Sequence, residues 1–263
     1  YGYDTVLDRA VKNNTVKVLL IYVLTTFHAY SQLSDDHLSV WLKDNVYEVD
    51  NLEPNNLNFN QFGALETAIG DRNIVLLGEQ THGDGTTFQA KVRLVKFLHQ
   101  KLGFETLVFE NGFYQSFKLW EELQNGMDYQ RSVPKGIHER WANVHQVQPI
   151  FSYIKNSVET SSPLKLMGMD ILFDGSYAKN TLITDFDCFL SFHYYELSKS
   201  ADYIFFKTEM YKFLTNQTYR PSPDTLKSFT AILDNYIEIL SLKISENDWD
   251  TDGFWSQVLS NFK

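Results

Sequence analysis

Three short apolar runs, separated by stretches with helical periodicity, constrain the fold of this chain more than any other feature of its sequence. The runs cover residues 74–77, 106–109 and 164–169. We expect the first run to form a strand buried on both faces, as in parallel sheets. Strands joined through helices lie parallel as neighbours with right-handed crossovers. The pattern therefore predicts an α/β fold, with an open, mainly parallel sheet flanked by helices.

Helical patterns surround these runs. Residues 86–102 place an apolar face at helical spacing, and Gly103 is suited to end that helix. Two helices are expected before the first strand, capped by Ser34 and Asn60, and Gly70 is expected to end the second. The polar stretch around Pro134 and Gly136 is interpreted as a loop of active-site size.

The chain after Gly175 has an almost wholly helical pattern, including a segment begun by Ser222 and Pro223. We therefore expect a leader and signal peptide (1–31), N-terminal helices (32–70), an α/β catalytic core (71–175) and a helical segment of the same domain (176–263). Three strands make a small sheet for such a fold, so we expect further strands beyond Lys263.

The N-terminus has the parts of a secretory signal in their usual order. Lys12 and Lys17 precede a mostly apolar run at 18–26, and small residues follow at Ala29 and Ser31. We predict export to the periplasm or the extracellular space, with cleavage after Ser31. The apolar run is too short to span a bilayer, which argues against a stable membrane anchor. A short buried strand or helix is the alternative interpretation.

Charge and cysteine content exclude several classes of partner and site. The formal net charge is -10, whereas nucleic acids and anionic membranes attract clustered Lys and Arg. A small-molecule substrate is the better expectation. The single cysteine, Cys188, excludes an intrachain disulfide or a Cys-rich zinc site, and we expect its side chain to be buried.

An acidic residue follows each predicted strand. Glu79 lies in the sequence Gly-Glu-Gln-Thr-His-Gly at 78–83, Glu110 follows the second strand, and Asp170 follows the third. Ligands bind at the carboxyl ends of parallel strands, so these carboxylates and His82 are expected to converge at one edge of the sheet. A histidine beside carboxylates can take a proton from water at neutral pH. The alternative is that a strand-terminal acid only caps a helix or binds loop amides, which is as strong an interpretation for Asp170.

Two basic residues stand on the helix that follows the motif. Lys91 and Arg93 lie in its N-terminal half, where the helix dipole disfavours a cation. A substrate or a carboxylate partner would compensate, so both are candidate substrate-binding residues. A solvated helix face is the alternative.

These segments together resemble the erythromycin esterase family. The resemblance rests on residues 74–83 with the Gly-Glu-x-Thr-His-Gly motif, on the helix through Leu102-Gly103-Phe104 and on Val108-Phe109-Glu110. It continues through the Trp141 region and Val147-Gln148-Pro149 to Leu166-Met167-Gly168-Met169-Asp170. It covers residues 62–190 in the family's order.

The resemblance implies an ester hydrolase, with a macrolide lactone as one candidate substrate. His82 would activate water, Glu79 would orient the histidine or the water, and Glu110 would match the acid after the second strand. Lys91 stands where the family usually has arginine. The family's second histidine lies in a C-terminal half to which nothing in this sequence can be matched.

Three alternatives to a cofactor-free esterase remain open. A divalent metal ion held by Glu79, His82, Glu110 and Asp170 would make the hydrolase metal-dependent. A truncated or degenerate family member would bind a ligand without catalysis or have no function of its own. A serine or cysteine nucleophile is the weakest, because the sequence has no Gly-x-Ser-x-Gly elbow.

Overall fold

The computed structural model describes residues 37–78, 81, 83–242 and 251–263, and the chain divides into two compact units, Tyr1–Asp50 and Asn51–Lys263. In the first unit, residues 37–45 form a helix on which Leu38, Trp41 and Leu42 are exposed. The predicted signal peptide and the predicted cap Ser34 lie outside the described residues. Among the described helices, none has the length and apolarity needed to cross a membrane.

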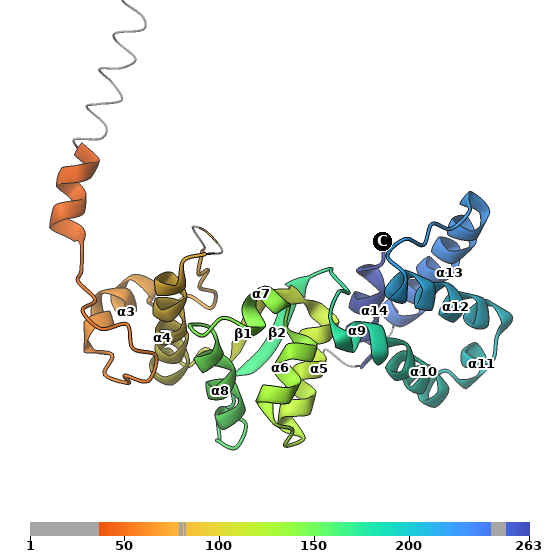
Figure 1. The fold of residues 1–263 in the computed structure, drawn as a ribbon, viewed down its shortest axis with the longest axis horizontal. Helices are drawn as coiled ribbons and strands as arrows, with labels where there is room; N and C mark the ends of the chain where they lie inside the picture. The colour runs from red at the N-terminus through yellow and green to blue at the C-terminus, as the bar shows by residue number, and fades with distance from the viewer. Residues whose placement is uncertain (1–36, 79–80, 82, 243–250) are drawn as a thin grey trace, which may run out of the picture. The chain divides into compact units, whose positions relative to one another are not determined.

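The second unit combines a small parallel sheet with many helices (Figure 1). Its elements are η1 (Asn60–Phe62), α3 (Gly63–Ile69), α4 (Gly85–Leu102), β1 (Thr106–Gly112), α5 (Phe113–Gln124), α6 (Tyr129–Gly136), α7 (Glu139–Ala142), α8 (Gln148–Ser157), β2 (Lys165–Asp170), α9 (Ser176–Asn180), α10 (Leu182–His193), α11 (Tyr195–Ser198), α12 (Ala201–Thr215), α13 (Pro223–Ser241) and α14 (Thr251–Ser260).

The sheet confirms the predicted α/β class and the second and third predicted strands. β1 and β2 pair in parallel, with Thr106 opposite Lys165 and Phe109 opposite Gly168. The register then shifts before Gly112, so β1 carries an irregularity near its carboxyl end. This irregularity lies where the two strands deliver Glu110 and Asp170.

The first predicted strand is not a strand in this structure, and the expectation that it is buried on both faces is wrong. Ile74 and Leu76 are 77% and 89% exposed, whereas Leu77 is half-buried against the core. β1 has the same alternation, with Val108 exposed and Leu107 half-buried. The physical reason is that only one face of this layer is covered by the described residues, so alternate apolar side chains stay in contact with solvent.

α4 follows its sequence signals closely. The Asp84 carboxylate accepts the backbone N–H groups of Thr86 (3.1 Å) and Thr87 (3.2 Å), which caps the helix. The hydrogen bond from the Thr87 hydroxyl is the largest cause that holds the pKa of Asp84 below its usual value. At the other end Gly103 adopts a φ of 72°, a left-handed conformation that favours glycine.

Two local predictions are wrong. Asn60 does not cap the helix before Gly70, because η1 precedes α3 and Phe62 occupies the cap position without a side-chain hydrogen bond. The stretch around Pro134 is not a loop but helix α6. Asp128 caps α6 by accepting the N–H of Gln130 at 3.1 Å, and the proline costs this short helix one backbone hydrogen bond.

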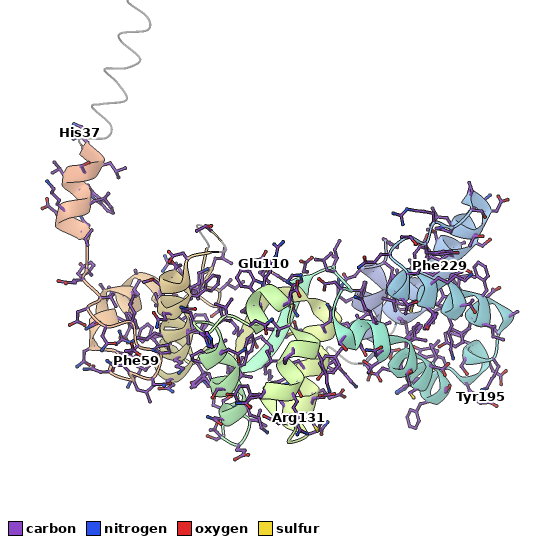
Figure 2. The ribbon with its side chains drawn as sticks, in the orientation of Figure 1. His37, Phe59, Glu110, Arg131, Tyr195 and Phe229 are labelled. Atoms are coloured by element: carbon purple, nitrogen blue, oxygen red, sulfur yellow. The ribbon has the colours of Figure 1, made fainter. Side chains whose placement is uncertain are left out.

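The chain after Gly175 is helical through its described residues, as predicted, and Ser222 caps α13 by accepting the N–H of Thr225 at 3.1 Å. Aromatic side chains pack between these helices. Phe229 of α13, labelled in Figure 2, stacks on Phe206 of α12 with ring centroids 4.9 Å apart. Cys188 is exposed on α10, which corrects the expectation of a buried thiol.

Candidate functional site

An apolar cavity of about 320 Å³ lies beside β1. Phe88 from α4, Phe109 from β1 and Trp141 from α7 form its aromatic wall, with ring centroids 4.9 Å apart for Phe88 and Trp141 and 6.3 Å apart for Phe109 and Trp141. Further apolar side chains come from α4, β1, α8, β2 and the segments before α4 and α8: Leu77, Val92, Val95, Leu107, Val108, Val147, Ile150, Met169. Such a cavity is of the size and character of a small-molecule site.

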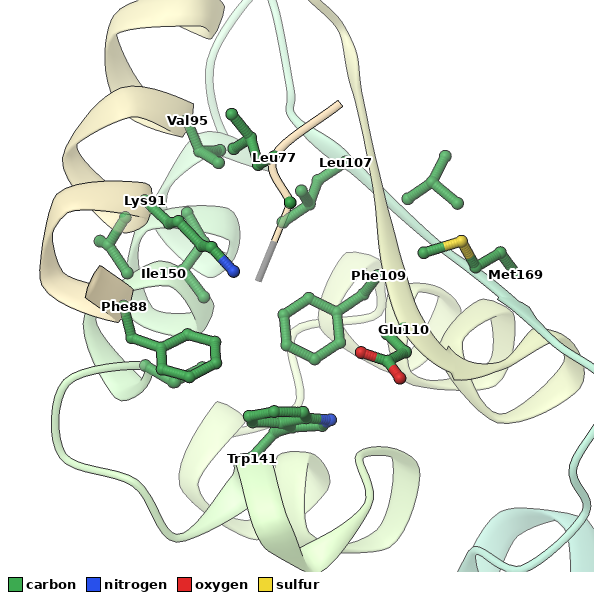
Figure 3. Close-up of a pocket in the computed structure, with 14 residues that line it drawn as sticks. Leu77, Phe88, Lys91, Val95, Leu107, Phe109, Glu110, Trp141, Ile150 and Met169 are labelled. Carbon is green, nitrogen blue, oxygen red and sulfur yellow. The ribbon is translucent and has the colours of Figure 1, made fainter. Parts of the chain in front are cut away.

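Lys91 and Glu110 are the charged residues among the described cavity lining. Figure 3 shows the Lys91 ammonium reaching into the cavity from α4, and the Glu110 carboxylate beside Trp141. The Lys91 Nζ also lies 4.7 Å from the centroid of the Phe88 ring, a cation–π contact. Gly78, the residue before Glu79, lines the same cavity. Lys91 is half-buried whereas Glu110 is exposed, so the cavity lining joins a partly sheltered cation to a carboxylate in contact with solvent.

A smaller polar cleft of about 110 Å³ adjoins the cavity, because Glu110 and Trp141 line both. Asp170, at the end of β2, and Asp174 are two more acidic residues that line this cleft, and the exposed Arg140 lines it as well. The structure therefore brings Glu110 together with Asp170 in the cleft and with Lys91 in the cavity, as the sequence predicts for the carboxyl ends of parallel strands.

His138 is held in the cleft by contacts at both ring nitrogens. Its Nδ1 accepts the backbone N–H of Arg140 at 3.2 Å, and its Nε2 lies 3.4 Å from Asp174 Oδ2. These partners assign the neutral tautomer with the proton on Nε2. His138 thus caps α7, the short helix that carries Arg140 and Trp141.

Buried amides hold the loops behind the cleft. The Asn111 amide donates to the Ser116 hydroxyl (2.8 Å) and the Gly136 carbonyl (2.7 Å), and its oxygen accepts the backbone N–H of His138 (2.9 Å). Gln115 donates to Asp174 Oδ1 at 3.1 Å. The Asn111 side chain thus has partners for both amide donors and for its oxygen, and this network fixes the local geometry beside the cleft. The Gln115 carbonyl oxygen is buried without a hydrogen-bond partner among the described residues.

Arg93 is not in the candidate site, which corrects its prediction as a substrate-binding residue. Its side chain is fully buried and donates to the backbone carbonyls of Asn51, Asn56 and Asn58. Lys96, one turn later, donates to the Pro54 carbonyl at 2.7 Å, and burial lowers its pKa. Both cations therefore fasten the loop before η1 onto α4.

Glu79 and His82, the predicted catalytic pair, lie outside the described residues. The metal alternative needs both, with Glu110 and Asp170, and the latter two do line one cleft. Among the residues that the structure does describe, no group of three His, Cys, Asp or Glu side chains is placed to hold a metal ion.

Sequence reasoning missed the roles of His138, Arg140 and Asp174. The polar stretch around Pro134 and Gly136, which the sequence predicts to be a loop of active-site size, was the available signal, since it runs directly into His138. Its helical form hid which residues face the cleft. Asp174 lacks a comparable signal because it follows β2 by four residues rather than standing at its end.

Comparison with known proteins adds two relatives. No family model matches the chain. A protein of Bacillus subtilis (strain 168) named "Putative hydrolase YbfO" is 27% identical over 168 residues, which are 63% of this chain and 36% of that protein. "Erythromycin esterase type II" of Escherichia coli is 36% identical over 73 residues, which are 28% of this chain and 17% of that protein. Both names are those of hydrolases. The matched segments span little more than a third of the first relative and about a sixth of the second.

Solved structures share the fold. A succinoglycan biosynthesis protein superposes with a TM-score of 0.67 at 19% identity, over 84% of this chain and 53% of that one. A protein from Bacillus cereus superposes with a TM-score of 0.59 at 19% identity, over 86% of this chain and 54% of that one. This chain therefore spans about half the length of the structures that it resembles.

Proposed function

We propose that this protein is a hydrolase that cleaves a carboxylic ester at the junction of the apolar cavity and the polar cleft. The observation that carries the proposal is the placement of Lys91 and Glu110 on an apolar cavity that Gly78 also lines. Gly78 immediately precedes Glu79 and lies four residues before the motif histidine His82. The hydrolase names of the two relatives support the reaction class.

In the proposed mechanism His82 takes a proton from water, and the resulting hydroxide attacks the ester carbonyl. Glu79 orients the histidine or the water. The carbonyl oxygen becomes negative as the tetrahedral intermediate forms, and the Lys91 ammonium stabilises that charge because the apolar wall excludes water. Glu110 accepts a hydrogen bond from the attacking water at the edge of the cavity. A macrolide lactone is one ester of this kind.

Hydrolysis of an ester panel, with simple aryl esters and a macrolide, tests the proposal. We expect the full chain to be active. In His82→Ala, kcat should fall about 10²- to 10⁴-fold, which is the usual contribution of a general base. His37→Ala is the matched control, because His37 is exposed on the helix of the first unit. A wild-type chain that is folded but inactive would refute the proposed catalytic activity and favour the ligand-binding alternative.

Exhaustive chelation distinguishes a hydrolase that needs no metal from one that depends on a divalent metal ion. The proposal without a metal predicts that hydrolysis survives treatment with a chelator. Loss of activity that is restored by a divalent ion would instead favour a metal held by Glu79, His82, Glu110 and Asp170. Export with cleavage after Ser31 is a separate proposal, tested by N-terminal sequencing of the secreted protein.

A further inference from the structure

The cavity and the cleft on either side of Glu110 differ sharply in chemistry. The cavity is lined by aromatic and aliphatic side chains, with Lys91 as its one described cation. The cleft is lined by Glu110, Asp170 and Asp174 together with Arg140. Trp141 and Glu110 belong to both, so a single ligand that crosses this boundary meets an apolar compartment on one side and a polar compartment on the other.

The volumes set the size of what each compartment takes. A cavity of roughly 150 Å³ is enough for a benzene ring, and the apolar cavity measures about 320 Å³. It therefore accommodates a ring with a short linker, which would contact the Phe88, Phe109 and Trp141 rings. The cleft of about 110 Å³ takes a short chain whose hydroxyl groups donate to carboxylates and accept from a guanidinium.

The direction of bond cleavage decides which half of an ester lies in which compartment. Water adds to the acyl carbon, the bond from that carbon to the alcohol oxygen breaks, and the alcohol oxygen takes up a proton as it leaves. Negative charge develops on that oxygen before it is protonated, and Arg140, which lines the cleft, is the cation on that side that can stabilise it. Lys91, the cation of the cavity, is already assigned to the carbonyl oxygen in the proposed mechanism, so a leaving oxygen in the cavity would lack a donor of its own.

We propose that the substrate is an ester of an apolar, ring-bearing acid with a hydroxylated alcohol, with the acyl group in the cavity and the alcohol in the cleft beside Arg140. This assignment rests on the proposed ester hydrolysis and names its substrate class. Arg140 then becomes a catalytic residue that touches the leaving oxygen.

Two isomeric esters test the orientation directly. 2-Hydroxyethyl phenylacetate has the apolar acyl group and the hydroxylated alcohol, whereas 2-phenylethyl glycolate has the same atoms with the polarity reversed. We expect kcat/KM to favour the phenylacetate by at least roughly tenfold, because the reversed ester places a ring among carboxylates and a hydroxyl in an apolar wall. Equal rates, or preference for the glycolate, would overturn the assignment.

Binding of the matching ketones separates this inference from the proposed reaction. 5-Hydroxy-1-phenylpentan-2-one and 1-hydroxy-5-phenylpentan-2-one copy the two esters without a cleavable bond, and titration calorimetry gives their affinities. If the first ketone binds more tightly and neither ester is hydrolysed, the result would support the assignment of the two compartments and refute the proposed ester hydrolysis. Tighter binding of the second ketone, or equal binding of both, would refute the compartments even if some ester is hydrolysed.

Arg140→Met tests the role of the guanidinium, with Arg131→Met as a matched control on an exposed position of α6. Loss of Arg140 should slow the alkyl phenylacetate about 10²-fold and 4-nitrophenyl phenylacetate much less, because 4-nitrophenolate leaves without help. A purely structural role would slow both esters equally, and that result would contradict a contact between Arg140 and the leaving oxygen.

Discussion

Lys91 and Arg93 show how two basic residues, two positions apart on α4, serve different purposes. Lys91 reaches the cavity, whereas the Arg93 guanidinium is buried and donates to three backbone carbonyls of residues 51–58. A guanidinium is well suited to this task because it offers five donors in a fixed plane. The cation–π contact with Phe62, at 5.0 Å, adds to the same attachment.

Arg93→Met should therefore destabilise the second unit rather than change substrate recognition. Removal of the donors leaves buried carbonyls unpaired, which costs about 1–3 kcal/mol for each group that water cannot reach. We expect a loss of about 3 kcal/mol in the free energy of unfolding, measured by chemical denaturation, with KM for the ester unchanged in the folded fraction. Arg131→Met, at an exposed position, should change stability little. A rise in KM without loss of stability would restore Arg93 to the substrate site.

The acidic residues at the ends of the two strands were predictable from the sequence, but the residues that line the cleft with them were not. The sequence places acids at Glu110 and Asp170, and the parallel pairing of β1 and β2 makes them neighbours in the cleft. His138 and Asp174 reach the same cleft from segments without a strand pattern. Their meeting depends on the buried hydrogen bonds of Asn111, which join residues 25 and 27 positions apart. No periodicity in a single sequence carries that information.

Helices with capping residues were predictable from the sequence, whereas the conformation of residues 74–77 was not. α4 and α13 form as their capping residues and helical spacing predict. Residues 74–77 have the composition of a buried strand, but a strand is defined by backbone partners and by covered faces. The described residues cover only the face on which Leu77 lies, so Ile74 and Leu76 remain exposed.

Gly168 tests how closely the two strands approach. A methyl group at this position would lie 2.4 Å from the Asn111 carbonyl oxygen and 2.5 Å from that of Gly112, both backbone atoms of β1. Gly168→Ala should therefore push the strands apart and lower the free energy of unfolding by about 1–3 kcal/mol. Gly63→Ala on α3 is the opposite control, since nothing lies within 4 Å of the added methyl and alanine favours the helix by about 1 kcal/mol. Thermal denaturation of both variants measures the difference, and a stable Gly168→Ala protein would contradict the close approach.

The fold of this protein is established by superposition on solved structures, whereas its function is a proposal argued from the site. The solved structures establish the fold at 19% identity, because their backbones superpose over more than four fifths of this chain. Function is argued from the site, since one fold hosts many reactions. Among the described residues, an apolar cavity, a cation and two acidic strand ends meet at the boundary beside Glu110, and the proposed hydrolysis is placed there.

The most direct test of that placement is the hydrolysis of 2-hydroxyethyl phenylacetate by Glu110→Gln, because Glu110 lines both compartments. Glu159→Gln is the matched control at an exposed position beyond α8. We expect kcat/KM to fall about 10²-fold in Glu110→Gln, the usual effect of removing a positioned carboxylate from proton transfer, and the control to keep wild-type activity. A Glu110→Gln protein as active as the wild type would contradict hydrolysis at this boundary and show that any hydrolysis occurs elsewhere on the chain.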